Sequence, residues 1–444
     1  MQILLGTQDV ALADLIKKSL HRFHYNWEET QNGFDVFQQS ITKKYDLILL
    51  AFDLPRMTAI EILRRFRSLD HFKSPPVIVL TETDNQRQEI DDEHFPQTEI
   101  ISHPISIRKL VSTIQQILHQ GVHIACVGGG TGLFTLLSGL KTLSGVSLSS
   151  IVAMSDDGGS TGILRTLFGI LPPGDVRRSL VALSNAPDLL NELMQYRFKR
   201  GAGLEGHNLG NLLLTALSEM RGSMSHAVKS LGEILNIQGQ VIPVTETVNT
   251  LKAEMDNGVV VEGEHRIDIF SGQEDSSVRI KRLWQEPEAK ATLDALVTLF
   301  NAHCIILGPG DLYTSIIANL IVGGIAQAVT TSKAKVIYIC NVMTKPGETG
   351  NYSAADHVRE VVRYLKIDRL DYVISSSTQF STDALKSYAV KGQVPVSDFD
   401  AEKMKEATKA KIIHADVASD HLLVRHDSLK LANVLKKIFD ESKT

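Results

Sequence analysis

Residues 122–162 read VHIACVGGGTGLFTLLSGLKTLSGVSLSSIVAMSDDGGSTG, and this stretch decides the fold that we expect. An apolar run at 123–127 ends in the glycine-rich turn 128–132, an amphipathic segment follows, and a second apolar run at 151–154 precedes two aspartates. This is the order of a strand, a tight turn, a helix and a strand in a Rossmann-like unit. In such a unit the glycines let the backbone approach a phosphate, and the N–H groups at the helix start point at the anion. The stretch therefore predicts a nucleotide-binding α/β domain.

The glycine turn matches neither of two well-known nucleotide signatures. The dinucleotide fingerprint needs a glycine at its sixth position, which is Leu133 when counted from Gly128 and Thr135 when counted from Gly130. No lysine follows the glycines, which excludes a Walker-type loop. The turn is then a phosphate cradle, or its glycines only permit close packing of the helix on the sheet.

Composition narrows the class of protein. The 444 residues are enough for two or three domains, and 43% hydrophobic with 22% charged residues is ordinary globular composition. A net charge of −5 gives no reason to expect nucleic-acid binding. The three cysteines lie in apolar runs and are expected to be buried reduced thiols. Because there is no signal-peptide pattern and no apolar run near the ~18 residues of a membrane span, we expect a cytoplasmic protein without membrane insertion.

Residues 1–119 predict a separate α/β domain. Apolar strands are expected at 2–5, 46–51, 76–80 and 99–101, and helices at 10–21, 59–67 and 107–118. Strands that alternate with helices at this spacing predict a parallel sheet. The segment YDLILLAFDLPRMTAIEILRRFR at 45–67, with Thr81 and His103-Pro104 further on, resembles a response-regulator receiver domain, which implies a flavodoxin-like fold.

The receiver-like domain departs from that family at its active site. The position of the phosphorylated aspartate, four residues before the proline, is Ala51, and the acidic pair that holds magnesium aligns with Thr7-Gln8. His103 replaces the lysine, Thr81 is retained, and Asp53 is shifted by two residues along the strand end. A carboxylate must both attack the phosphoryl group and lie beside a metal ion to react. We therefore expect a degenerate receiver that serves dimerisation or contact with the second domain.

From residue 122 to the C-terminus at 444, the chain resembles the YvcK/CofD-like family, which includes bacterial gluconeogenesis factors and archaeal-type 2-phospho-L-lactate transferases. The resemblance is carried by VGGGTG (127–132), SDDGGSTGILR (155–165), LPPGDVRRSLVAL (171–183), GHNLGN (206–211), GPGDLYTSI (308–316) and NVMTKPGETGNYSAADHV (341–358). It is greater to the gluconeogenesis-factor branch. The expected fold is a doubly wound, Rossmann-like parallel sheet. Short alternating runs at 238–284, with a hairpin turn at 256–258, predict a small β-rich insertion.

Two aspartates follow the second strand of the opening stretch. A Rossmann-like unit places an acidic residue there against a ribose hydroxyl group, and a carboxylate there can also hold a metal ion. Because adjacent residues of an extended strand point to opposite faces, we expect Asp157 rather than Asp156 to face the ligand. The alternative is that both are solvated loop carboxylates.

Two further motifs precede helices. Asp175 is placed to cap a helix at 176–185, whose first turn contains Arg177 and Arg178. Cations there oppose the helix dipole, which favours a nearby anion, although simple surface charges remain an alternative. The segment 206–211 offers His207, Asn208 and Asn211 to a phosphate or a base, or else forms an asparagine cap with a satisfied histidine.

A second glycine turn, 308–310, follows the apolar strand 304–307 and precedes a helix expected at 313–319. Strand 336–340 then delivers Asn341 and Thr344 to the same edge of the sheet. Several loops would converge on one crevice, which favours ligand binding over a purely structural use of glycine. Where the family usually has an asparagine after the next strand, this chain has Ser375-Ser376-Ser377.

These patterns and the family resemblance give one set of candidate residues. The candidate ligand-binding residues are Gly128, Gly129, Gly130, Thr131, Gly132, Asp156, Asp157, Arg177, His207, Asn208, Asn211, Gly308, Pro309, Gly310, Tyr313, Thr314, Ser315, Asn341 and Thr344. The resemblance implies a UDP-sugar or nucleoside diphosphate as ligand, in a homo-oligomeric regulator of central carbon metabolism, cell-envelope growth and cell shape. This function requires no cofactor. The alternative is a Mg²⁺-dependent transferase of a phospholactyl group from a GDP-linked donor, with Asp157 as catalytic or metal-binding residue.

Overall fold

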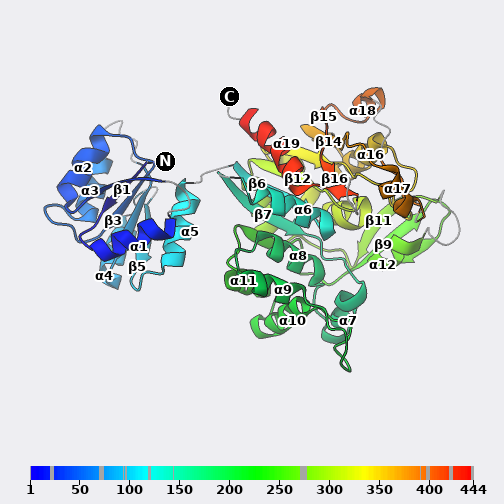
Figure 1. Ribbon diagram of the computed structural model, residues 1–444, viewed down its shortest axis with the longest axis horizontal. Coiled ribbons are helices and arrows are strands. Elements are labelled where there is room, and N and C mark those ends of the chain that lie inside the picture. The colour runs from blue at the N-terminus through cyan, green and yellow to red at the C-terminus, as the bar shows by residue number, and fades with distance from the viewer. Residues whose placement is uncertain are drawn as a thin grey trace. The chain divides into compact units, whose positions relative to one another are not determined.

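The computed structural model describes residues 2–20, 25–69, 75–93, 95, 98–118, 122–143, 145–270, 278–390, 392–396, 401–419 and 424–441. The chain divides into two compact units, Met1–Gly121 and Val122–Thr444 (Figure 1). The linker residues Gln120 and Gly121 lie outside the described residues.

The first unit is a five-stranded parallel sheet in the order β2-β1-β3-β4-β5, which is the flavodoxin-like order. Its strands are β1 (Gln2–Gly6), β2 (Asn26–Thr30), β3 (Leu47–Ala51), β4 (Val77–Thr81) and β5 (Thr98–Ser102). Its helices are α1 (Val10–Leu20), α2 (Gly33–Thr42), α3 (Ala59–Ser68), α4 (Asp84–Glu93) and α5 (Ile107–Leu118). One apolar core lies under α1 and α5, and another lies under α2, α3 and α4. The flavodoxin-like fold expected from the receiver resemblance is thus confirmed.

The strand and helix assignments from the sequence miss three of these elements, β2, α2 and α4. β2 reads NWEET and pairs only with β1 at the edge of the sheet, so it carries no apolar run. α4 buries only Ile90 among its ten residues, so its sequence has no apolar stripe. These elements are held by tertiary contacts that a pattern of apolar residues does not reveal.

The second unit is built on a seven-stranded sheet in the order β15-β14-β13-β12-β6-β7-β8, and every pair in it is parallel. Its strands are β6 (Val122–Gly128), β7 (Val146–Val152), β8 (Gln240–Pro243), β12 (Cys304–Leu307), β13 (Lys335–Ile339), β14 (Tyr372–Ser376) and β15 (Lys411–Ala415). The predicted doubly wound sheet is confirmed. β7 begins five residues before the predicted strand, because Ser147, Ser149 and Ser150 interrupt its apolar pattern.

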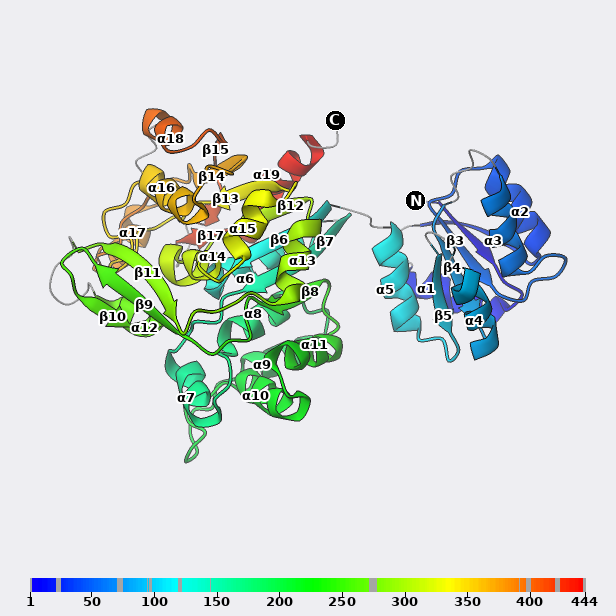
Figure 2. The same ribbon diagram turned by 180° about the vertical axis from the view of Figure 1, so that it is seen from behind.

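Helices cover both faces of this sheet. α6 (Gly130–Leu140), α8 (Gly174–Leu183) and α19 (Ser428–Glu441) pack together on one face (Figure 1). α13 (Leu293–Asn301), α15 (Ile325–Thr331) and α16 (Ala354–Leu365) pack on the other (Figure 2). The central strands are fully buried between these layers, and the three cysteines are buried and free.

The β-rich segment is smaller than the sequence predicts. β9 (Thr250–Met255), β10 (Val260–Glu262) and β11 (Ile280–Glu286) form a three-stranded antiparallel sheet with α12 (Glu264–Ile269), and the expected turn Asp256–Gly258 joins β9 to β10. β8 lies within the predicted insertion but pairs parallel with β7, so it belongs to the main sheet. A strand of four residues gives no local sign of which sheet it joins.

The other elements of the second unit lie around the edges of the sheet or in its connections. They are α7 (Gly159–Phe168), α9 (Asp188–Gln195), α10 (Leu209–Arg221), α11 (Met224–Ile234), a π-helical turn (Leu312–Ile317), α14 (Ala318–Leu320), α17 (Thr382–Ala389), α18 (Ala401–Ala407), β16 (Ala418–Ser419) and β17 (Arg425–His426). The π-helical turn replaces most of the helix predicted at 313–319.

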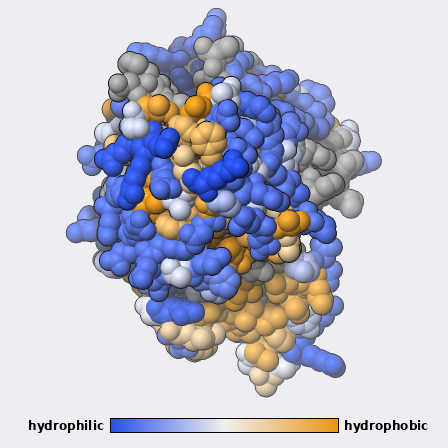
Figure 3. Space-filling model, turned by 90° about the vertical axis from the view of Figure 1, so that its left-hand side faces the viewer, coloured by the Kyte–Doolittle hydropathy of each residue, from blue (hydrophilic) through white to orange (hydrophobic). Residues whose placement is uncertain are grey.

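Hydrophilic side chains cover most of the face in Figure 3, and apolar side chains gather mainly in its lower part, with smaller groups above. On the second unit, large apolar side chains are exposed on α7, α9 and α10, of which α10 contacts both others. They include Leu167, Leu189 and Met220. Such a surface is typical of protein interaction sites, and the homo-oligomer stays a prediction. Within the described part of the chain, we find no helix with the length and apolar character needed to cross a bilayer.

Candidate functional site

The carboxyl ends of β6 and β12 mark the topological switch point of the main sheet. From β6 the chain runs outward through β7 and β8, whereas β12 to β15 build the other half. Ligands of doubly wound folds bind in the crevice outside this point. A cavity of about 620 Å³ lies there, between the turn after β6 and the turn after β12. We call it the glycine-turn cavity, and its volume is within the usual range for small-molecule sites.

The two glycine turns contact each other because Gly132 has no side chain at the point of contact. A Cβ atom at Gly132 would lie 2.4 Å from the Pro309 carbonyl oxygen, which is backbone and has little room to move. Gly130 has φ +64°, a conformation that favours glycine. The structure gives the Thr131 and Gly132 N–H groups no acceptor among the described residues. The start of α6 thus presents N–H donors at the cavity wall.

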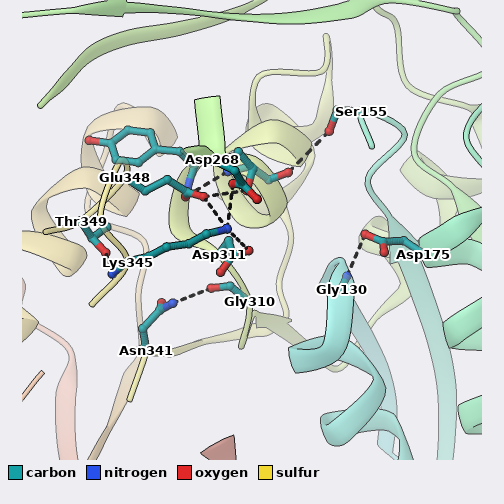
Figure 4. Close-up of polar contacts among 12 residues, drawn as sticks. Gly130, Ser155, Asp175, Asp268, Gly310, Asp311, Asn341, Lys345, Glu348 and Thr349 are labelled. Carbon is teal, nitrogen blue, oxygen red and sulfur yellow. Dashed lines mark hydrogen bonds and ion pairs between the residues drawn. The ribbon is translucent and has the colours of Figure 1, made fainter. Parts of the chain in front are cut away.

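One donor of this turn is already engaged by a carboxylate. The Gly130 N–H donates to Asp175 Oδ2 at 2.7 Å (Figure 4). The other oxygen of Asp175, Oδ1, accepts from Arg178 Nη1 at 2.8 Å. Burial raises the pKa of Asp175, and the Arg178 guanidinium group opposes that effect. The prediction that Asp175 caps its own helix is wrong, because α8 begins at Gly174 without a side-chain cap and Asp175 reaches α6 instead.

At the second glycine turn, a buried carboxylate occupies the hydrogen-bond donors at the start of the helix. The carboxylate of Glu348 accepts from the Tyr313 N–H at 2.9 Å and from the Thr314 hydroxyl group at 2.9 Å. Its side chain is fully buried. The predicted anion site at the start of this helix is therefore filled by the chain itself. Pro309 and Gly310 still line the glycine-turn cavity through the loop before it.

Lys345 lies among three carboxylates beside this turn (Figure 4). Its Nζ atom is 2.7 Å from Asp268 Oδ1 and from Asp311 Oδ2, and 3.2 Å from Glu348 Oε1. We call Asp268, Asp311 and Glu348 the carboxylate triad. Burial alone would lower the pKa of Lys345, but the triad raises it, so the ammonium ion persists.

Among the residues that the structure describes, the triad is a group of side chains close enough together to hold a metal ion. Its three carboxylates offer oxygen atoms within 4.8 Å of one another. In this arrangement, however, the Lys345 ammonium group supplies the positive charge, so a divalent cation would have to displace it. Asp157 is not part of the triad, because its Oδ1 accepts from the His265 N–H at 2.8 Å. Magnesium at Asp157 stays a prediction.

The structure brings about half of the candidate residues to the glycine-turn cavity. Those lining it are Gly129, Gly130, Thr131, Gly132, Pro309, Gly310, Ser315, Asn341 and Thr344. Asn341 Nδ2 donates to the Gly310 carbonyl oxygen at 2.8 Å, and Asn341 Oδ1 has no partner within the described part of the chain. Gly128 ends β6 directly behind the turn, and Gly308 begins the facing loop.

Other candidate residues lie elsewhere. Tyr313 is fully buried and its hydroxyl group bonds to Tyr352 and Glu360. Thr314, at 3% exposure, turns its hydroxyl group to Glu348. Neither lines the glycine-turn cavity. Adjacent residues of the π-helical turn point in different directions, so only Ser315 reaches the cavity.

The two aspartates after β7 also turn away from the glycine-turn cavity. Asp157 lines a separate cavity of about 640 Å³, with Arg165 and Thr250. Asp156 Oδ1 accepts from the Gly158 N–H at 3.0 Å. The expectation that Asp157 faces the ligand of the glycine turn is therefore not met by this geometry, because the chain bends at Gly158 before α7.

Arg177 belongs to a buried polar cluster. Its Nε atom donates to Asn211 Oδ1 at 2.9 Å, and burial lowers its pKa to about 10. His207 Nδ1 lies 3.1 Å from Ser160 Oγ, and Asn208 caps α10 by accepting from the Asn211 N–H. The asparagine cap with a satisfied histidine is thus the arrangement found, and these residues do not line the glycine-turn cavity.

The sequence did not point to several residues of the cavity wall. They are Thr135, Asp311, Val342, Met343, Lys345, Ser387, Tyr388, Gln393, Val424, Arg425 and His426. Asp311 and Lys345 stand within the family motifs, so the motifs themselves were a usable signal. Residues from α17 and β17 have no local signature, because they reach the cavity only through the fold.

Comparison with known proteins agrees with this architecture. The family profile for 2-phospho-L-lactate transferase CofD matches residues 124–418, and the profile for response-regulator receiver domains matches residues 3–115. A Thermotoga maritima protein is 41% identical over 321 residues, which cover 71% of this chain and 98% of that protein.

A second relative and a solved structure are also similar to this chain. The gluconeogenesis factor of Bacillus subtilis is 41% identical over 323 residues, 72% of this chain and 99% of that protein. A crystal structure of a Bacillus halodurans protein, 37% identical, covers 71% of this chain and all of that chain with a TM-score of 0.68. The chain therefore belongs to the CofD/YvcK family of gluconeogenesis factors, with a response-regulator receiver domain at its N-terminal side.

Proposed function

We propose that this protein is a nucleotide-sugar-binding regulator of the gluconeogenesis-factor type, which takes a UDP-sugar into the glycine-turn cavity. The proposal rests above all on one observation. The cavity lies at the switch point of a doubly wound sheet and has helix N–H donors in its wall. We assign the diphosphate to the glycine turn of residues 129–132. Central carbon metabolism and cell-envelope and cell-shape control are the processes it would serve, as the family resemblance implies.

The remaining wall suits the uncharged parts of such a ligand. Tyr388 and Met343 offer an aromatic and an apolar surface for a base. Gln393 offers hydrogen-bonding groups for sugar hydroxyls. Arg425 is exposed and brings positive charge to the cavity rim. In this function the protein binds and orients the ligand without breaking a bond.

A second candidate function is a transferase that moves a phospholactyl group from a GDP-linked donor. It is favoured by the family profile, which carries the description 2-phospho-L-lactate transferase. Mg²⁺ would supply neutralisation of the diphosphate leaving group in that chemistry. The carboxylate triad is the group of residues that fits such an ion, provided that Lys345 moves away.

Calorimetric titration of the full chain tests the proposal. The ligands are UDP-N-acetylglucosamine, UDP-glucose, GDP and NAD, each with and without Mg²⁺, and ³¹P NMR monitors breakdown. We expect magnesium-independent binding of a UDP-sugar without turnover. A preference for GDP that requires Mg²⁺ would favour the transferase, and absence of UDP-sugar binding would refute the regulator.

A pair of arginine variants locates the binding site. Arg425→Ala removes a charge from the wall of the glycine-turn cavity and should weaken UDP-sugar binding by about fivefold to tenfold. Arg221→Ala removes the same charge from the end of α10, outside that cavity, and should leave the affinity unchanged. Equal effects of the two changes would argue against this site.

A further inference from the structure

The two glycine turns of the sheet edge hold internal carboxylates of different character. Glu348 is fully buried at the π-helical turn, where it also accepts from Lys345, so it is part of the fixed interior. Asp175 lies at the start of α6 and pairs with Arg178, whose side chain is 42% exposed. Asp175 is thus held by a more exposed cation than Glu348, whose partner Lys345 is 22% exposed, and it accepts directly from the N–H group of a cavity-lining glycine.

Asp175 holds the donors that an anion at this turn would use. One is the Gly130 N–H at 2.7 Å, and the other is Arg178 Nη1 at 2.8 Å. The contact with the turn is close, since a Cβ atom at Gly129 would lie 2.5 Å from Asp175 Oδ2. An amide donor and a guanidinium group are the usual partners of a phosphate oxygen.

The surroundings of Asp175 weaken its hold on this position. Its side chain is nearly buried, and the carboxylates of Asp156 and Asp311 repel it. Charge-assisted hydrogen bonds to Gly130 and Arg178 offset the cost of burial. Asp175 therefore holds these donors less firmly than a carboxylate without such neighbours would, and a phosphate oxygen can compete for them.

We propose that Asp175 is an internal competitor for the phosphate position at the α6 turn, and that ligand binding transfers the Gly130 N–H and Arg178 from its carboxylate to a ligand phosphate. This inference rests on the proposed function for the location of the ligand, and it adds a residue that sets the selectivity. The incoming group must displace a monoanion, so the site discriminates against neutral ligands and weak anions. The Thr131 and Gly132 N–H groups, which have no acceptor among the described residues, give a polyphosphate its first contact.

The test is titration of the full chain with inorganic pyrophosphate and with uridine, at fixed ionic strength. Asp175→Asn and Asp175→Ala should each tighten pyrophosphate binding by about tenfold, and uridine binding should stay unchanged. The control is Asp294→Asn, which removes a carboxylate from the first turn of α13 on another part of the sheet and should have no effect. Thermal unfolding of each variant establishes that it is folded.

A double variant tests the exchange of partners. In Asp175→Asn/Arg178→Gln the gain in pyrophosphate affinity should fall by more than half, because one of the released donors is missing. An undiminished gain would overturn the role of Arg178. Unchanged or weaker pyrophosphate binding in both single variants would overturn the competition itself.

The same titrations separate this inference from the proposed function. If the Asp175 variants bind pyrophosphate more tightly but no form of the protein binds a UDP-sugar, the competition stands and the proposed function fails. If UDP-sugars bind equally to wild type and to both variants, the proposed function stands and the competition fails. If neither pyrophosphate nor a UDP-sugar binds to any form, both are wrong.

Discussion

The carboxyl edges of the two parallel sheets carry very different side chains. In the first unit β3 ends in Ala51, and Thr81 at the end of β4 donates its hydroxyl hydrogen to Ser102. Asp53, the nearest carboxylate, is exposed and accepts from Gln86 Nε2. In the second unit the equivalent edge carries two glycine turns, the carboxylate triad and Lys345.

The difference teaches that a parallel sheet supplies a position for a site and not the site itself. Both sheets direct their loops to the carboxyl edge. The second unit gathers buried charge and a cavity there, whereas the edge of the first unit carries Ala51, Thr81 and the exposed Asp53. Buried charges are costly unless they are paired, so the second edge should respond strongly to substitution. The first edge should respond weakly.

The largest effect is expected at Lys345. Lys345→Met would leave the carboxylate triad without its cation and should lower the free energy of unfolding by about 3–5 kcal/mol. Burial already raises the pKa of Asp311 and Glu348, and loss of Lys345 would raise both further. When the folded-state pKa of a carboxyl group lies above its unfolded-state pKa, the protein loses stability as the pH rises from the unfolded-state value through the folded-state value. The deficit should therefore be larger at pH 8 than at pH 5, as measured by urea unfolding.

A surface lysine serves as the control for that experiment. Lys335→Met removes an ammonium group 3.7 Å from Asp371 at a half-exposed position and should cost about 1 kcal/mol or less. Similar costs for the two lysines would mean that the triad is not held by Lys345.

The next effect concerns the contact between the two glycine turns. Gly132→Ala would place a Cβ atom 2.4 Å from the Pro309 carbonyl oxygen and should destabilise the second unit by about 1–3 kcal/mol. Gly128→Ala is the matched control, since its nearest neighbours lie at 3.8 Å or more. In thermal unfolding, the Tm of the Gly132→Ala variant should lie well below that of the Gly128→Ala variant. Equal Tm values would show that the turns separate easily.

A smaller effect, of opposite sign, is expected at Glu264. Burial, Asp268 and Asp156 raise the pKa of Glu264 to about 9. Its folded-state pKa lies above the unfolded value, so its contribution to stability is full below about pH 4 and is lost as the pH rises towards 9. Glu264→Gln should therefore stabilise the protein at pH 8 by about 1–2 kcal/mol and have little effect at pH 4.5. Urea unfolding at both values checks this, and a loss of stability at pH 8 would contradict it.

The smallest effect is expected at the edge of the first unit. Acetyl phosphate with Mg²⁺ should not phosphorylate the full chain, because Ala51 offers no carboxylate at the end of β3. Intact-mass spectrometry would detect the 80 Da addition of a phosphoryl group. An addition that appears in the full chain and is lost in Asp53→Asn would contradict the prediction of a degenerate receiver. An active receiver domain treated in parallel is the positive control.

Much of the fold was predictable from the sequence. The strands β1, β3, β4, β6, β12, β13 and β14, the helix at 354–365 and the turn at 256–258 follow from local patterns of apolar residues and turn formers, whereas β15 was not predicted. β2 and α4 were missed because they bury few side chains, and β8 was assigned to the wrong sheet because strand pairing is a long-range property. The glycine-turn cavity was anticipated in its backbone and only partly in its side chains.

The sequence by itself determined the doubly wound sheet, the family and the two glycine turns that meet at the switch point. The sheet and the turns follow from periodicity and from residues adjacent in the chain, so local chemistry is enough for them, whereas the family follows from the resemblance of its motifs. Only the tertiary structure decided which charges occupy those turns. Asp175 reaches Gly130 across 45 residues, and Glu348 reaches Tyr313 across 35, because the sheet brings separate loops together at one edge. The direction of a side chain at a loop depends on such distant neighbours, and no local pattern encodes it.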